Sequence, residues 1–130
     1  MNFLRFWFPV LAYSGIIFYV SSLETVKTPQ SIPHFDKVCH LAEYGLFGLL
    51  LARAISHSVT KIDRIILIAI AALGAFLYGL TDEFHQSLVP GRQADVADLV
   101  ADTVGGLLGG LIYIIFEIMI KKRIDKKCQV

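Results

Sequence analysis

The residues best suited to chemistry lie between positions 81 and 102, in the stretch TDEFHQSLVPGRQADVADLVAD. It contains five of the eleven acidic residues, one histidine and an arginine in a Pro-Gly turn. Carboxylates with a histidine can bind a divalent metal ion, and a histidine beside a carboxylate can act as a general base. An arginine can hold a phosphate or a carboxylate through two hydrogen bonds. Apolar runs flank the stretch, and ionisable groups at the edge of membrane-type segments are costly enough to indicate a function.

Helical periodicity gathers these residues, and a second polar group near position 40, into three stripes. At about 100° per residue, the members of each stripe share one helix face. The stripes are Asp36, His40, Glu43 and Tyr44; Tyr78, Asp82, His85 and Gln86, with Glu83 offset; and Asp95, Asp98 and Asp102. Arg92 lies in the loop between the last two stripes. Asp102 lies roughly 10 Å below that loop, so we expect it to face the bundle interior and to have a partner.

Ordinary structural roles also account for several of these residues. Asp95 can cap a helix N-terminus, and Asp98 can interact favourably with the helix dipole, but neither role explains Asp102. Asp36 can cap a helix in the same way. His40 and His85 can be ordinary histidines at the membrane interface, and Tyr44 and Tyr78 can be aromatic residues of the interfacial belt. Arg92 can be a solvated loop charge, or can form a salt bridge with Asp82 or Asp95.

The composition indicates a membrane protein. Of the 130 residues, 55% are hydrophobic and 18% are charged, and the mean hydropathy is +0.63. A spanning helix needs about 20 mostly apolar residues, and lipid-exposed backbone must satisfy its own hydrogen bonds. We therefore predict an all-α fold, a single domain with four transmembrane helices at about residues 3–20, 38–56, 64–86 and 96–120. The second helix is the weakest because it carries His40, Glu43 and Arg53.

The first apolar segment could also be a cleaved signal peptide, because Arg5 precedes its apolar core. No small-residue cleavage site of the usual kind follows, since Ser21-Ser22-Leu23 is a poor substitute. We therefore expect this segment to be a retained helix.

The basic residues predict how the helices are oriented. Four spans place both termini, and the loop between the second and third helices, on one side of the membrane. That side carries nine Lys and Arg residues, against three on the other side, which are Lys27, Lys37 and Arg92. By the positive-inside rule we expect both termini to be cytoplasmic. Eight of the eleven acidic residues then lie in or beside the outer loops.

Other features predict packing and partners. Two small-xxx-small pairs, Gly105 with Gly109 and Gly106 with Gly110, predict close helix contacts in lipid, to which Gly45, Gly48, Gly74 and Gly79 can contribute. Cys39 and Cys128 fall on opposite sides of the membrane, so we expect no disulfide, and no zinc-type cysteine spacing exists. The basic segment KKRIDKK is better explained as a juxtamembrane anchor than as a nucleic-acid contact. The expected partner is the lipid bilayer.

At these residues the sequence resembles the VanZ-like family of small bacterial membrane proteins. The matching pieces, in chain order, are Asp36-Lys37-x-x-His40 with Tyr44, Asp82-Glu83-x-x-Gln86, Pro90-Gly91-Arg92, Asp95-x-x-Asp98 and Gly105-Gly106-x-x-Gly109. They span roughly residues 10–118, and their order and spacing together are specific although no single piece is. One departure is Asp102 before Thr103, where the family is associated with asparagine.

The resemblance implies a polytopic helical protein of the bacterial envelope. The family's namesake is linked to low-level resistance to the glycopeptide antibiotic teicoplanin, but the family does not supply an established reaction. Residues of this chain that match the family's motifs are Asp36, His40, Tyr44, Asp82, Glu83, Gln86, Arg92, Asp95 and Asp98.

Three hypotheses follow. In the first, the outer face binds an anionic envelope lipid or a glycopeptide, with Arg92 at the headgroup and Tyr44 and Tyr78 lining the pocket. Its ligand-binding set is Asp36, His40, Tyr44, Tyr78, Asp82, Glu83, Gln86, Arg92, Asp95, Asp98 and Asp102. In the second, the protein is a metal- or His-assisted hydrolase or transferase acting on a phosphate- or glycan-bearing lipid. His40 would be its general base, and the candidate ligands of a divalent metal are Asp36, Asp82, Glu83 and Asp98.

In the third hypothesis the polar stripes are an internal network of a small structural or partner-binding scaffold. The pattern alone does not decide among the three, and an oligomer is compatible with each. A conduction pathway would require an oligomer, because 130 residues are few for a transporter acting alone.

Overall fold

The chain forms four helices in a computed structural model that describes residues 3–24 and 34–128. The helices are α1 (Phe3–Ser21), α2 (Phe35–Ser58), α3 (Arg64–Gln86) and α4 (Val96–Cys128). The described residues contain no strand. Each helix is long and apolar enough to cross a membrane. The prediction of an all-α, four-helix membrane protein is therefore confirmed. Lys27, counted above among the outer basic residues, lies outside the described residues.

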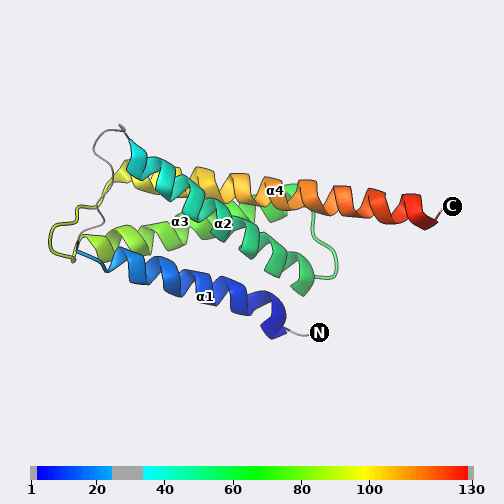
Figure 1. Cartoon of the computed structure of the whole chain (residues 1–130), viewed down its shortest axis with the longest axis horizontal. Helices are drawn as coiled ribbons and strands as arrows, with labels where there is room; N and C mark the ends of the chain where they lie inside the picture. The colour runs from blue at the N-terminus through cyan, green and yellow to red at the C-terminus, as the bar shows by residue number, and fades with distance from the viewer. Residues whose placement is uncertain (1–2, 25–33, 129–130) are drawn as a thin grey trace.

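The helices run alternately up and down, so that their ends form two groups (Figure 1). The start of α1, the α2–α3 connection and the end of α4 lie together at one end of the bundle. The ends of α1 and α3 and the starts of α2 and α4 lie at the other. We call this second end the polar end, because it carries the three predicted polar stripes.

Helix starts are set by local sequence. Asp63 precedes α3, and its Oδ1 accepts hydrogen bonds from the backbone N–H groups of Ile65 (2.8 Å) and Ile66 (3.3 Å). Asp95 caps α4 in the same way, since its Oδ1 accepts from Ala97 N at 2.9 Å. These carboxylates satisfy N–H groups that have no partner inside the helix. The capping role predicted for Asp95 is confirmed. Asp36 instead lies in the first turn of α2, which begins at Phe35.

The fourth helix is longer than its apolar segment. It continues past residue 120, the expected end, to Cys128, and residues 121–128 are all exposed. Hydropathy locates only the part of a helix that lies in lipid, whereas lysine and arginine are good helix formers in water. At about 1.5 Å per residue α4 is roughly 50 Å long, and it projects beyond the other helices (Figure 1).

Glycines bring α2 and α4 into backbone contact. A Cβ atom added at Gly48 would lie 2.5 Å from the carbonyl oxygen of Gly106, and one at Gly105 would lie 2.5 Å from that of Leu41. Side chains larger than hydrogen therefore cannot be accommodated at these crossings without moving a helix. Close approach of this kind lets dispersion forces hold helices together in lipid, where the hydrophobic effect gives no drive. The packing role predicted for the glycines is confirmed.

The interior between the helices is small and apolar away from the polar end. One cluster of buried residues joins α1, α2 and α3 and includes Val10, Ile17, Tyr44, Phe47 and Ala75. The outer faces of all four helices are also apolar, with many exposed leucines, isoleucines, valines and phenylalanines. Outer faces this apolar fit the hydrocarbon core of a lipid bilayer.

Candidate functional site

The buried polar side chains are confined to one end of the bundle. Among the described residues, every buried polar or charged side chain lies at the polar end: Ser21, Asp82, Glu83, Gln86, Asp98 and Asp102. Ser21 ends α1, the next three residues are in the last turns of α3, and the last two are in the first turns of α4. Isolated carboxylates are strongly disfavoured in an apolar bundle, so each requires compensating contacts.

Lys37, in the first turn of α2, links three carboxylates. Its ammonium nitrogen lies 3.0 Å from Asp36, 2.5 Å from Asp95 and 2.8 Å from Asp98. The pKa of Asp95, which lies in the loop before α4, is lowered because its carboxylate accepts a hydrogen bond from Lys37. This contact joins the start of α2 to the start of α4.

His40 pairs with the deepest carboxylate. Its Nδ1 lies 2.9 Å from Oδ1 of Asp102, whose side chain is fully buried. Asp102 fits there because residue 79 has no side chain: a Cβ at Gly79 would lie 2.6 Å from Asp102 Oδ2. The other ring nitrogen of His40, Nε2, lies 4.0 Å from Oδ1 of Asp98. The expectation that Asp102 faces inward and has a partner is confirmed.

The carboxylates of α3 have different partners. Asp82 accepts a hydrogen bond from the side-chain amide of Gln86 at 3.0 Å. Oε2 of Glu83 accepts one from the backbone N–H of Asp95 at 2.7 Å. Oε1 of Glu83 is buried and has no hydrogen-bond partner in the described part of the chain, and the same is true of Oδ2 of Asp102. A buried polar atom without a partner loses about 1–3 kcal/mol relative to its hydrated state.

Arg92 is held against the end of α1. The Pro-Gly turn depends on Gly91, whose φ of 81° lies in the left-handed region that glycine adopts without strain. Beyond this turn the guanidinium donates to the backbone carbonyls of Leu23 (3.2 Å) and Val20 (3.0 Å) and to Oε1 of Gln86 (3.2 Å). Arg92 therefore bonds neither Asp82 nor Asp95, the two salt-bridge partners considered from the sequence.

A pocket of about 330 Å³ opens among these side chains. All four helices and the loop before α4 contribute to its wall. The residues that line it are Val20, Glu24, Asp36, Cys39, His40, Glu43, Gln86, Gly91, Arg92, Gln93 and Asp98. Of the predicted ligand-binding set, it thus brings together Asp36, His40, Gln86, Arg92 and Asp98. Glu83 and Asp102 lie behind it, in contact with Asp95 and His40.

The two predicted tyrosines are not among the described residues that line this pocket. Tyr44 is fully buried, and its ring lies 6.3 Å from that of Tyr78, centroid to centroid. Tyr78 stacks on Phe47 at 5.2 Å and donates its hydroxyl hydrogen bond to Ser14 O at 2.7 Å. The pair therefore belongs to the apolar core beneath the site, and the structure gives no support to a lining role.

Two contributors to the site were not in the predicted set. From the sequence, Lys37 is one of three outer charges and a position of the Asp36-to-His40 motif, but it had no assigned role at the site. Glu43 shares the stripe of His40 and lines the pocket. His85 was noted as a member of the α3 stripe, but it bonds Ser22 (3.0 Å) and packs on Phe18, outside the cluster.

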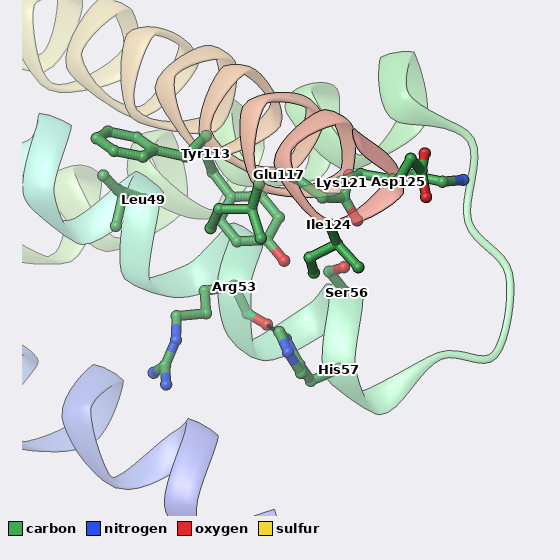
Figure 2. Close-up of a pocket in the computed structure, with 11 residues that line it drawn as sticks. Leu49, Arg53, Ser56, His57, Tyr113, Glu117, Lys121, Ile124 and Asp125 are labelled. Carbon is green, nitrogen blue, oxygen red and sulfur yellow. Dashed lines mark hydrogen bonds between the residues drawn. The ribbon is translucent and has the colours of Figure 1, made fainter. Parts of the chain in front are cut away.

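A larger pocket, of about 700 Å³, lies at the opposite end and was not anticipated. Figure 2 shows residues of its wall: Ser56 and His57 on α2 lie across from Ile124 on α4, while the side chain of Arg53 runs away from α4. Leu49, Tyr113 and Glu117 also line it. Lys121, Ile124 and Asp125 in its wall belong to the stretch of α4 beyond residue 120, which the hydropathy of the sequence does not reveal.

Comparison with known proteins identifies the family. A search of curated proteins and a search of solved structures each find no match. A family model described as VanZ/LLP1 matches residues 3–117. The match extends over most of the chain and includes every residue of the polar end described above. The chain therefore belongs to the VanZ/LLP1 family, as its motifs indicated, and is a multi-pass membrane protein of VanZ type.

Proposed function

We propose that this chain acts as a single transmembrane domain in the bacterial cytoplasmic membrane. Its polar end would bind the headgroup of an envelope lipid or a glycopeptide, and would thereby affect susceptibility to glycopeptides such as teicoplanin. The observation that carries the proposal is the polar pocket of about 330 Å³ at one end of an otherwise apolar bundle. Packing four helices in lipid requires no such pocket, whereas ionisable groups at membrane depth commonly serve a ligand.

The distribution of basic residues supports an outward-facing polar end. The opposite end carries Arg5, Arg53, Lys61, Arg64, Lys121, Lys122, Arg123, Lys126 and Lys127. In the described residues the polar end has only Lys37 and Arg92, and both are engaged with carboxylates or carbonyls. By the positive-inside rule, both termini would then lie in the cytoplasm. The cationic end of α4 would lie beside the anionic inner leaflet, which attracts such segments.

The lining of the pocket narrows the ligand chemistry. Four carboxylates face it, from Glu24, Asp36, Glu43 and Asp98, against the single guanidinium of Arg92. Arginine has five N–H donors, and three of these are used within the protein. A phosphate can therefore bind the remaining donors of Arg92. The carboxylates suit ammonium or hydroxyl groups of the same headgroup, such as those of an amine-bearing lipid or a glycopeptide.

Two measurements test this proposal together: the susceptibility of cells to teicoplanin and the amount of lipid that copurifies with the protein. Expression of the wild-type chain in a glycopeptide-susceptible bacterium is expected to raise the inhibitory concentration of teicoplanin. Arg92→Ala and Asp82→Asn are expected to lose this effect, and lipid copurifying with each variant, measured by mass spectrometry, is expected to fall. Arg64→Ala, an exposed cation at the opposite end, is the control. Folded variants that keep both the full effect and the wild-type lipid content would refute the proposal.

A second candidate function is hydrolysis or transfer at a phosphate or glycan linkage of the bound lipid. It is favoured by the pairing of His40 with Asp102, which fixes the ring and leaves Nε2 without a hydrogen-bond partner in the described residues, as a general base requires, and by the place of His40 in the pocket wall. His40→Ala is then expected to abolish turnover of envelope lipid by purified protein in vesicles. Unchanged turnover would exclude it. Variants that lose stability but neither turnover nor lipid binding would instead favour the scaffold hypothesis.

A further inference from the structure

Three residues from three helices bring metal-ligating atoms together at the wall of the pocket. His40 on α2, Glu83 on α3 and Asp98 on α4 each present a nitrogen or oxygen atom, and these atoms lie within 4.8 Å of one another. Glu83 and Asp98 are 5% and 7% exposed. The sequence makes Glu83 and Asp98 candidate metal ligands and His40 a candidate general base and a member of the ligand-binding set.

The orientation of His40 is the one that a metal ligand needs. Its Nδ1 is held by Asp102 at 2.9 Å, which leaves Nε2 without a hydrogen bond in the described residues. That free nitrogen lies 4.0 Å from Oδ1 of Asp98. Metal-ligating histidines commonly bond their second ring nitrogen to a carboxylate, which fixes both the tautomer and the ring plane. Asp102 would serve as that carboxylate.

Glu83 supplies an independent observation that favours a cation at this place. Its Oε1 is buried and has no hydrogen-bond partner among the described residues. No described Lys, Arg or His lies within 4.0 Å of this carboxylate, although Lys37 and His40 approach Asp98 and Asp102. A buried carboxylate without a counter-charge is strongly disfavoured in a low-dielectric interior. A dication beside Glu83 would remove that deficit.

We propose that Nε2 of His40 and the carboxylates of Glu83 and Asp98 bind one divalent transition-metal ion, for which Zn²⁺ is the best-suited species. Imidazole with carboxylates suits Zn²⁺, and three protein ligands leave a fourth position open toward the pocket. Ligand atoms about 2.1 Å from zinc lie about 3.4 Å apart in a tetrahedron. The present separations therefore require only side-chain adjustment. The site does not depend on which headgroup the pocket receives.

Lys37 gives the proposal a distinctive consequence. Its ammonium group lies 2.8 Å from Oδ1 of Asp98, the oxygen that also faces His40. A metal ion and this ammonium therefore compete for Asp98. Replacing Lys37 by an uncharged side chain of similar length is expected to raise metal affinity, an effect that misfolding cannot produce.

Zinc titration of the purified chain tests the site directly. Protein in detergent, stripped with a chelator, would be titrated with Zn²⁺ alone and its metal content measured by mass spectrometry. A Cys39→Ser, Cys128→Ser background removes both thiols as competing ligands. We expect one Zn²⁺ per chain, with affinity lowered at least about ten-fold by His40→Ala and by the near-isosteric Glu83→Gln. His85→Ala, a histidine of the same end but outside the cluster, is the control and should bind normally.

Each outcome of the zinc titrations either supports or contradicts the three-residue site. Glu83→Gln keeps the size of its side chain, so it carries the test if His40→Ala fails to fold. Lys37→Met is expected to bind Zn²⁺ more tightly than the parent. Zinc binding that Glu83→Gln leaves unchanged, or that His85→Ala lowers as much as His40→Ala does, would overturn the proposal. An unchanged or weaker affinity of Lys37→Met would remove Asp98 from the ligand set and overturn the three-residue site.

Discussion

His40 and Asp102 join α2 to α4 through a contact of 2.9 Å between Nδ1 and Oδ1, with Asp102 fully buried. Asp102→Ala leaves the ring without this partner and opens a cavity beside Gly79, so we expect a loss of about 1–3 kcal/mol in the free energy of unfolding. Asp102→Asn retains an oxygen at the same place, and its loss should be smaller. Equilibrium unfolding in detergent measures both. Equal losses for the two variants would show that the contact is not stabilising.

The contact between α2 and α4 predicts a contrast among glycines. Gly48→Ala would place a methyl group 2.5 Å from the carbonyl oxygen of Gly106, and overpacking of this kind costs about 1–3 kcal/mol. Gly15→Ala in α1 meets no atom within 4 Å, and alanine favours the helix there. Thermal unfolding should therefore show a clear decrease for the first variant and none for the second. Similar midpoints for the two would contradict the packing described.

The two cysteines provide a test of topology without added probes. Cys39 lies near the start of α2, at the polar end, and Cys128 is the last residue of α4. Both are free and exposed. If the polar end faces outward, a membrane-impermeant maleimide should label Cys39 in intact cells and Cys128 only after permeabilisation. Cys39→Ser and Cys128→Ser each retain one thiol and assign the signal. Labelling of Cys128 in intact cells would reverse the proposed orientation.

The Lys37–Asp95 pair predicts a pH-dependent difference. The pKa of Asp95 is lowered in the folded chain by its hydrogen bond from Lys37. A carboxyl whose folded pKa is depressed contributes stability above its unfolded value, near 3.9, and loses it as pH falls through the lower folded value. Asp95→Asn should therefore lower the unfolding temperature at pH 7 and have little effect near pH 2. Asp125→Asn, on the exposed end of α4 and away from this pair, is the control variant.

Hydropathy and periodicity were sufficient to predict the four helices and the end of the bundle at which the polar residues gather. Four apolar segments require four helices in lipid, and polar residues at three helix ends must then meet. The same periodicity did not separate Tyr44 from His40, because residues four positions apart share a face but differ in depth by about 6 Å. That difference places His40 in the site and Tyr44 in the core.

Contacts between helices could not be predicted from stripes on single helices. Glu83 lies off the stripe of α3, yet it faces α4, because α3 packs against α4 as well as against α2. Lys37 was not assigned to the site, because the sequence places it at the membrane interface and does not show that its long side chain reaches Asp95, just before α4. The hydrogen bond from Arg92 to the carbonyl of Val20 in α1 could not be predicted either, because it depends on where the turn at Gly91 lies against α1 in the folded chain.

The glycines between α2 and α4 have a mechanical consequence. Close backbone approaches run from Gly105 against Leu41 to Gly109 against Leu49, with Gly106 against Gly48 in the same stretch, and so extend over about two helical turns. A line of contact of this length holds no flexible side chains and leaves no single point for rotation. We therefore expect the two helices to move as one rigid unit, with His40 and Asp98 at one end and Arg53 and Lys121 at the other.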